Sequence, residues 1–129
     1  MPQFNDPQIN IYARDVEAMT RFYTEILGFR ETFRVPKTGA PDHVEVRLEG
    51  LLLGFASMAA AKAHHGFDAD RQETRAEVVL WVDNCDEAYS HLLANGATAV
   101  SEPHDFIGTL RGAWVADPEG NPIHMVARL

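Results

Sequence analysis

The sequence predicts an α+β fold built from two modules, each with the order strand, helix and three strands. The prediction starts from two segments that share one pattern at an offset of 69 residues. They are QINIYARDVEAMTRFYTEILGF, which starts at Gln8, and EVVLWVDNCDEAYSHLLANGA, which starts at Glu77. Three short strand-like stretches then follow each segment. Alternation and helix caps are common individually, but chance is a poor explanation for the whole order occurring twice.

The first module begins with a strand and a capped helix. Asp15 is the expected N-cap, because its carboxylate can accept hydrogen bonds from the free N–H groups of the first turn. Gly28 offers the left-handed conformation that often ends a helix. Between them, apolar side chains recur at the spacing of a one-sided helix: Met19, Phe22, Tyr23, Ile26 and Leu27. The three predicted strands after this helix are RETFRVP, DHVEVRLEG and LLLGFAS.

The second module repeats this plan with a weaker helix. Asn84 takes the place of Asp15 as the N-cap, and the helix ends at Asn95 and Gly96. Its three strands are TAVSEP, RGAWVAD and PIHMVAR, and HDFIGTLRG is interpreted as a loop. Between the modules lies a linker with a short helix over MAAAKAHH. The modules are thus about residues 6–57 and 76–129, the linker is 58–75, and residues 1–129 form a single domain.

Composition limits the classes of function. The chain has 129 residues and a formal net charge of -8, which makes nucleic acid a poor partner. Cys85 is the single cysteine, so no intrachain disulfide forms. The start MPQFNDPQ does not resemble a signal peptide, and the most apolar stretch, LLLGFASMAAA, is shorter than the ~20 residues of a membrane span. We therefore expect a cytoplasmic protein without a membrane anchor.

Strand alternation places the candidate functional side chains on one face of each sheet. On a strand of period two, Gln8 shares a face with Asn10 and Tyr12, and Glu77 shares a face with Trp81. The opposite faces are uniformly apolar and suit packing against the helices. On the last strand, His124 then points away from the apolar core that its two neighbours enter.

The motifs ARDVEAMTRFYTEILGF, VDNCDEAYSHLLANGA and VADPEGNPIHMV resemble those of the vicinal oxygen chelate superfamily. This superfamily includes glyoxalase I, bleomycin-resistance proteins, fosfomycin-resistance enzymes and extradiol dioxygenases. The resemblance covers nearly the whole chain and implies that each βαβββ module forms a cupped antiparallel half-barrel. It also implies a homodimer with ligand sites near the subunit interface. It specifies the fold better than the reaction, because the superfamily hosts several activities.

One reading of the resemblance is a metal enzyme. The superfamily's ligand positions fall on Gln8, Gly54, Glu77 and His124, so three of the four carry donor atoms. Three protein ligands and a water suit an open Lewis-acid site for Zn, Ni, Fe or Mn. In a glyoxalase-type lyase or isomerase, Glu77 would be the catalytic base. A ring-cleaving dioxygenase ranks third, because the set of two histidines and one carboxylate is not present.

The other reading is a metal-independent binding protein. The ending DPEGNPIHMVA resembles that of bleomycin-resistance proteins, which carry a histidine in this strand and hold no catalytic metal, and Trp81 resembles their tryptophan. Gly54 would then leave space for a bulky ligand. Tyr12, Trp81 and Phe106 could stack on flat rings, and the negative charge favours a cation.

We favour the second reading, in which the protein binds or sequesters a partly aromatic, preferably cationic, small molecule without a cofactor. The predicted ligand-binding residues are Tyr12, Gly54, Trp81, Phe106, Arg111 and His124. The alternative is the divalent-metal enzyme with Gln8, Glu77 and His124 as ligands. Two structural explanations stay open as well: His124 as a satisfied core histidine, and Arg111 as the ion-pair partner of Glu77. A structural dimer with a filled cup is the last alternative.

Overall fold

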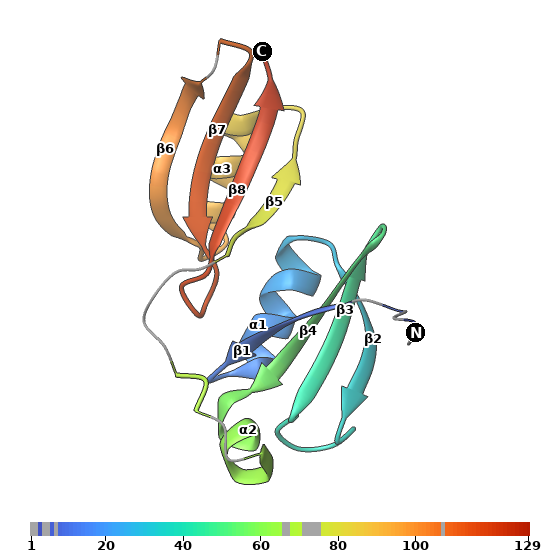
Figure 1. The fold of residues 1–129 in the computed structure, drawn as a ribbon. Coiled ribbons are helices and arrows are strands. Elements are labelled where there is room, and N and C mark those ends of the chain that lie inside the picture. Colours follow the sequence, from blue (N-terminus) through green and yellow to red (C-terminus); the bar gives the residue numbers. More distant parts are fainter. Residues whose placement is uncertain (1–2, 4–5, 7, 66–67, 71–75, 107) are drawn as a thin grey trace. The chain divides into compact units, whose positions relative to one another are not determined.

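The structure, a computed structural model, describes residues 3, 6, 8–65, 68–70, 76–106 and 108–129. It confirms an α+β fold in which strand, helix and three strands occur twice (Figure 1). The first set is β1 (Ile9–Ala13), α1 (Val16–Arg21) with the π-helical turn η1 (Phe22–Ile26), β2 (Arg30–Val35), β3 (His43–Leu48) and β4 (Leu51–Ser57). The second is β5 (Val78–Trp81), α3 (Cys85–Ala94), β6 (Thr98–Phe106), β7 (Leu110–Ala116) and β8 (Pro122–Arg128). Along the chain, helix α2 (Met58–His65) comes between the two sets, where the sequence predicts a short helix.

The chain divides into two compact units, which are described separately. Unit 1 is Met1–Arg71 and unit 2 is Gln72–Leu129. The strand order is β1-β4-β3-β2 in unit 1 and β5-β8-β7-β6 in unit 2. Each unit therefore builds one four-stranded sheet, with its first and last strands side by side.

Both sheets are mixed, which corrects the expectation of purely antiparallel half-barrels. The last three strands of each unit are antiparallel to their neighbours, but β1 runs parallel to β4 and β5 runs parallel to β8. The reason is the connection. A crossover helix returns the chain to the sheet in its original direction, and the next two connections each reverse it, so the fourth strand runs with the first.

The predicted helix caps are present. Asp15 Oδ1 accepts from the Ala18 N–H at 2.9 Å, and Asn84 Oδ1 accepts from the Glu87 N–H at 3.0 Å. The first helix differs from the prediction in its second half, where the π-helical turn replaces regular α-helix. The turn changes the helical register, but Phe22 and Tyr23, both on the predicted apolar face, are buried. A strict 3.6-residue period does not predict this change of register.

Each unit buries its core between the sheet and the helix on one face of it. In unit 1 the Tyr23 and Phe55 rings meet at a centroid distance of 4.8 Å. In unit 2 the fully buried side chains include Ile123, Met125 and Val115. Burial of one such side chain contributes roughly 1.5–3 kcal/mol. Because alternate residues point to opposite faces, this burial fixes which residues of β7 and β8 lie on the face away from α3.

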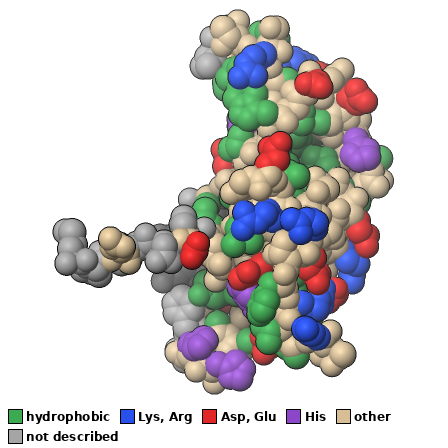
Figure 2. All heavy atoms as spheres, turned by 90° about the vertical axis from the view of Figure 1, so that its right-hand side faces the viewer, with side chains coloured by type: hydrophobic (Ala, Val, Ile, Leu, Met, Phe, Trp, Pro, Cys, Tyr) green, Lys and Arg blue, Asp and Glu red, His purple; other side chains and the backbone are tan. Residues whose placement is uncertain are grey.

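Charge is distributed unequally between the units. Residues 72–129 hold three basic and nine acidic residues, so unit 2 carries -6 of the net -8. On the face drawn in Figure 2, charged side chains of both signs are interspersed with apolar ones. No helix in the described part of the chain has the length and apolar character needed to cross a membrane.

Candidate functional site

The face of the unit 2 sheet opposite α3 brings aromatic side chains together. His124 on β8 lies directly opposite Trp114 on β7 in the antiparallel register. Its neighbours Ile123 and Met125 are buried in the core. His124 therefore lies on the face away from the helix, as strand alternation predicts.

Four rings from three strands form a cluster on this face. The Trp114 and His124 rings are stacked, with centroids 3.8 Å apart and planes at 10°. His104 on β6 stacks with Trp114 at 5.8 Å and 21°. Phe106 lies 5.9 Å from the His124 ring and 6.4 Å from the Trp114 ring. We call His104, Phe106, Trp114 and His124 the aromatic cluster.

Glu77 joins the cluster through Trp114. The indole Nε1 donates a hydrogen bond of 2.9 Å to Glu77 Oε2, and Glu77 Oε1 lies 3.9 Å from His124 Nδ1. The Glu77 side chain is 40% exposed, whereas His124 is only 9% exposed. The cluster thus places one carboxylate, still open to solvent, at the edge of a stack of rings.

His124 fits the sheet because Gly112 has no side chain. A Cβ atom at Gly112 would lie 2.7 Å from His124 Nε2 and 2.9 Å from Phe106 Cε1. The Nε2 atom is buried and makes no hydrogen bond to the described residues. Burial lowers the pKa of His124, and His104 lowers it further, while the negative charge of Glu77 opposes both. Hence the imidazole is neutral at pH 7.

The other two predicted ligand residues of unit 2 lie on opposite sides of the sheet. Trp81 shares the face of the cluster and is 55% exposed, and the Arg128 guanidinium lies 4.5 Å above its ring. Arg111 is adjacent to Gly112 on β7, so its side chain points to the opposite face of the sheet, toward α3.

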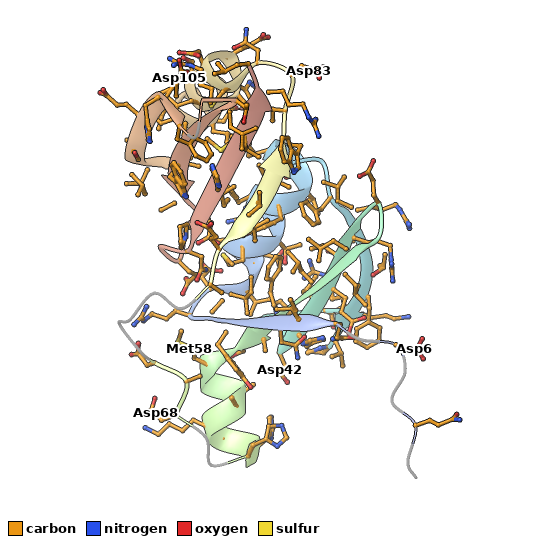
Figure 3. The ribbon with its side chains drawn as sticks, turned by 45° about the horizontal axis from the view of Figure 1, so that its top comes forward. Asp6, Asp42, Met58, Asp68, Asp83 and Asp105 are labelled. Carbon is orange, nitrogen blue, oxygen red and sulfur yellow. The ribbon has the colours of Figure 1, made fainter. Side chains whose placement is uncertain are left out.

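On the helix side of the sheet, Arg111 forms two ion pairs. Its guanidinium binds Asp86 of α3 at 2.6 Å and Asp105 of β6, labelled in Figure 3, at 2.8 Å. The hydrogen bond from Arg111 lowers the pKa of Asp86. Arg111 therefore ties the sheet to α3 and does not lie with the aromatic cluster or pair with Glu77.

Two of the predicted residues of unit 1, Gln8 and Gly54, lie at a polar cluster, and the third, Tyr12, lines a pocket described below. Gln8 Nε2 donates to Asn10 Oδ1 at 2.9 Å and to Glu45 Oε2 at 3.2 Å. His43 Nε2 lies 3.0 Å from the same oxygen of Glu45. A Cβ atom at Gly54 would collide with Asn10 Oδ1 and lie 2.7 Å from His43 Cε1. The space above Gly54 is thus occupied by this chain's own side chains and is not left open for a bulky ligand.

The donor set does not fit a metal centre within either unit. Gln8 belongs to unit 1, whereas Glu77 and His124 belong to unit 2. One of the Glu77 oxygens already accepts the Trp114 hydrogen bond. Nowhere among the described residues are three His, Cys, Asp or Glu side chains grouped to hold a metal ion. An open catalytic site typically has three protein ligands, so the two donors in unit 2 are too few on their own.

The prediction from sequence missed Trp114 and His104. Both carried a signal. Trp114 lies two residues after Gly112 in RGAWVAD, and His104 and Phe106 are also two residues apart. Residues at this spacing lie on one face of a strand. The loop interpretation of HDFIGTLRG hid the second signal, because β6 in fact continues to Phe106 through two register shifts against β7.

Two βαβββ units, each with a helix on one face of a mixed sheet and a polar or aromatic cluster on the other, define a paired-module α+β protein. The chain belongs to the Glyoxalase/Bleomycin resistance protein/Dioxygenase superfamily, whose family model matches residues 7–125. The resemblance seen in the sequence motifs is thereby confirmed. No curated protein matches the sequence.

Solved structures share the fold over nearly the full chain. A glyoxalase/bleomycin resistance protein/dioxygenase from Nocardioides is 22% identical, with 100% of this chain and 87% of that chain covered and a TM-score of 0.76. TioX from Micromonospora sp. ML1 is 21% identical, with 97% and 100% covered and a TM-score of 0.71. Lactoylglutathione lyase from Agrobacterium tumefaciens is 15% identical, with 97% and 95% covered and a TM-score of 0.70. Likeness at these identities establishes the fold and leaves the activity open.

A comparison of two glycine substitutions tests the packing of the two clusters. Gly112→Ala should lower the free energy of unfolding by about 1–3 kcal/mol, because the new methyl group meets the ends of two packed rings. Gly54→Ala should cost less than Gly112→Ala, because its methyl group meets Asn10, which is exposed and can rotate away, and His43, whose side chain is 21% exposed compared with 11% for His124. Urea denaturation of both variants measures the difference. Equal losses would contradict this account of the aromatic cluster.

The lowered pKa of His124 predicts a pH dependence of stability. The folded state binds a proton at this ring less readily than the unfolded chain, whose histidine pKa is near 6.5. The contribution of neutral His124 is therefore complete above pH 6.5 and is lost as the pH falls below it. His124→Gln cannot titrate, so the stability advantage of the natural chain over this variant should shrink between pH 7.5 and pH 5. A difference that stays constant across these pH values would argue against a proton-excluding site.

Proposed function

We propose that this protein binds a small, partly aromatic molecule on the aromatic cluster of unit 2, without a metal and with a preference for cations. The observation that supports this most strongly is the stack of Trp114 on His124 with Glu77 at its edge. Phe106 and Trp114 are only partly buried, so ring surface remains for a ligand. Flat rings stack favourably on such surfaces.

The preference for a cation follows from charge and burial together. Glu77 is the carboxylate of the cluster, and neutral His124 does not offset its charge. Unit 2 as a whole carries -6. The position of Arg128 over Trp81 provides an internal example of a cation placed on a ring of this face.

The second candidate is a divalent-metal lyase or isomerase of the glyoxalase type. Its support is the approach of His124 Nδ1 to Glu77 Oε1, at 3.9 Å, together with the fold shared with a lactoylglutathione lyase. This function would require further ligands in addition to Glu77 and His124. For this reason we rank it below metal-independent binding. With either function, we propose a homodimer that works in the cytoplasm.

Tryptophan fluorescence tests the binding proposal. Titration with the planar cation N-methylquinolinium should quench the natural chain and also the Trp81→Phe variant, in which Trp114 is the remaining reporter. Glu77→Gln keeps an oxygen for the Trp114 hydrogen bond but removes the charge, so it should weaken binding by about tenfold. The neutral analogue quinoline, at a pH where it is uncharged, is the control for charge. Absence of quenching at millimolar concentration would refute the proposal.

Elemental analysis distinguishes the two candidates. Protein purified without chelator should contain far less than one equivalent of zinc, nickel, iron or manganese, because Glu77 and His124 are the only members of the predicted donor set in unit 2. The His124→Ala variant serves as the comparison. Near-stoichiometric metal in the natural chain that disappears in this variant would establish the enzyme reading instead.

A further inference from the structure

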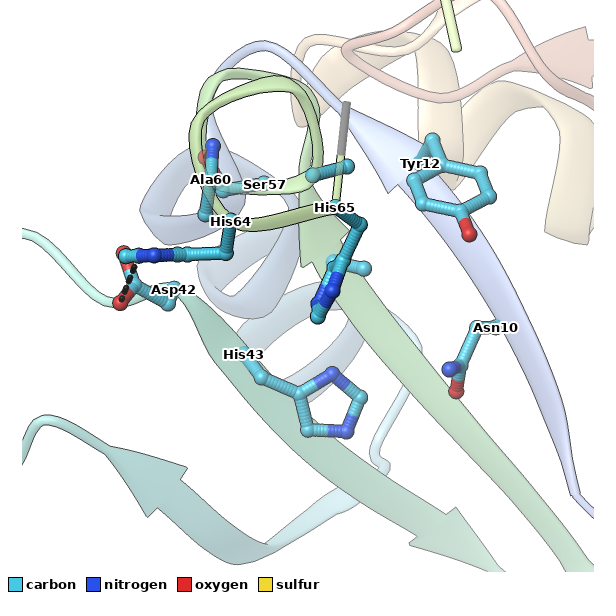
Figure 4. A pocket seen from close by; sticks show the side chains of 10 residues that line it. Asn10, Tyr12, Asp42, His43, Ser57, Ala60, His64 and His65 are labelled. Carbon is cyan, nitrogen blue, oxygen red and sulfur yellow. Dashed lines mark hydrogen bonds and ion pairs between the residues drawn. The ribbon is translucent and has the colours of Figure 1, made fainter. Parts of the chain in front are cut away.

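A separate pocket lies within unit 1, whereas the aromatic cluster belongs to unit 2. It has a volume of about 490 Å³, within the range of small-molecule sites. Strands β1, β3 and β4 supply one part of its lining and helix α2 supplies the other (Figure 4). Asn10 and Tyr12 come from β1, and Ala60 and Ala61 come from α2. The pocket thus combines small apolar side chains with polar groups.

The polar cluster of unit 1 orients one wall of this pocket. His43 lines the pocket, and its Nε2 is 3.0 Å from Glu45 Oε2. A carboxylate can only accept, so His43 Nε2 carries a proton, and in the ring with one proton Nδ1 is then the acceptor. Glu45 is itself held by the Gln8 amide. This three-residue chain fixes the tautomer of a ring that faces a cavity.

Asp42 supplies the charge of the pocket. Among the described residues that line it, Asp42 is the one Asp, Glu, Lys or Arg. It is about half exposed, and its carboxylate lies 3.9 Å from His64 Nε2, the pair marked by a dashed line in Figure 4. Asp42 is thus the carboxylate of the pocket, whereas Glu45 contacts His43 and is not part of the lining.

We infer that this pocket binds a small organic cation that carries several N–H groups, such as an amidine or a primary amine, on a compact apolar body. The N–H groups would donate to His43 and Asp42, and the apolar body would lie on the alanine side chains of α2 and β4. An anion would meet the Asp42 carboxylate, and a purely apolar molecule would make no hydrogen bond to His43 or Asp42. The inference goes beyond the proposed function, which concerns unit 2, and each can fail without the other.

Three probes of matched shape test the charge preference on the full chain. Benzamidine, benzamide and benzoate share one ring and differ in charge. In ¹H–¹⁵N spectra, benzamidine should shift the amide signals of Tyr12, His43, Ala56 and Ala60, with a Kd on the order of millimolar for so small a molecule. Benzamide should bind more weakly and benzoate should cause no saturable shift. Equal responses to benzamidine and benzoate would overturn the inference.

Variants locate the binding. Ala60→Phe fills the pocket from α2 and should abolish the benzamidine shifts, whereas Ala63→Phe places the same ring at an exposed position of the same helix outside the pocket lining and should leave them intact. Asp42→Asn keeps the shape of the side chain and should weaken benzamidine by about fivefold, a result that does not depend on whether Ala60→Phe folds. Unchanged binding in Asp42→Asn, or shifts confined to unit 2 signals such as Trp114, would refute the inference. Quenching of Trp114 by N-methylquinolinium would persist in that case if the proposed function is right.

Discussion

The packing of a histidine ring above a glycine of the neighbouring strand organises both candidate sites. In unit 2, His124 of β8 occupies the space that a side chain at Gly112 of β7 would need. In unit 1, His43 of β3 lies in the same way above Gly54 of β4. A β-sheet normally fills both positions of such a diagonal pair with side chains that stand away from the sheet. The glycine removes one of them, so the ring is held where Trp114 can stack on it in unit 2 and where it can line a pocket in unit 1.

The two units share this arrangement, but the histidine and the glycine exchange strands between them. In each unit, the residue before the first strand shares a hydrogen bond with a residue of the third strand, at matching positions of the register. Gln8 donates to Glu45 in unit 1, and Glu77 accepts from Trp114 in unit 2. The histidine lies on the third strand in unit 1 and on the fourth strand in unit 2, and the glycine takes the other strand in each case. The two units thus share this geometry but differ in the chemistry of the side chains that they present. One unit presents a carboxylate–imidazole chain, and the other presents stacked rings with a carboxylate at the edge.

The sequence was sufficient for features that depend on local periodicity. The two caps, the order of the elements and the face on which His124 lies follow from spacing and residue type alone. The parallel pairing of β1 with β4 was also within reach, because a crossover helix followed by two reversals requires it. The π-helical turn and the register shifts of β6 were not, since each depends on tertiary packing that overrides the local period. The superfamily's ligand positions did not predict the cluster around Glu45, because His43 and Glu45 lie on a different strand from all of them.

Burial, rather than composition, gives the aromatic cluster its electrostatic character. Many acidic proteins have a similar net charge without any preference for cations. Here the His124 ring is enclosed by Trp114, Phe106 and the backbone at Gly112, so that its pKa is lowered and it stays neutral beside a carboxylate. An exposed histidine in the same place would share a proton with Glu77 and cancel its charge. The indole N–H of Trp114 donates a hydrogen bond to Glu77 but carries no formal charge that would offset the carboxylate. The stack thus keeps one negative charge next to flat apolar surface, and that combination is the physical basis of the proposed preference for a planar cation.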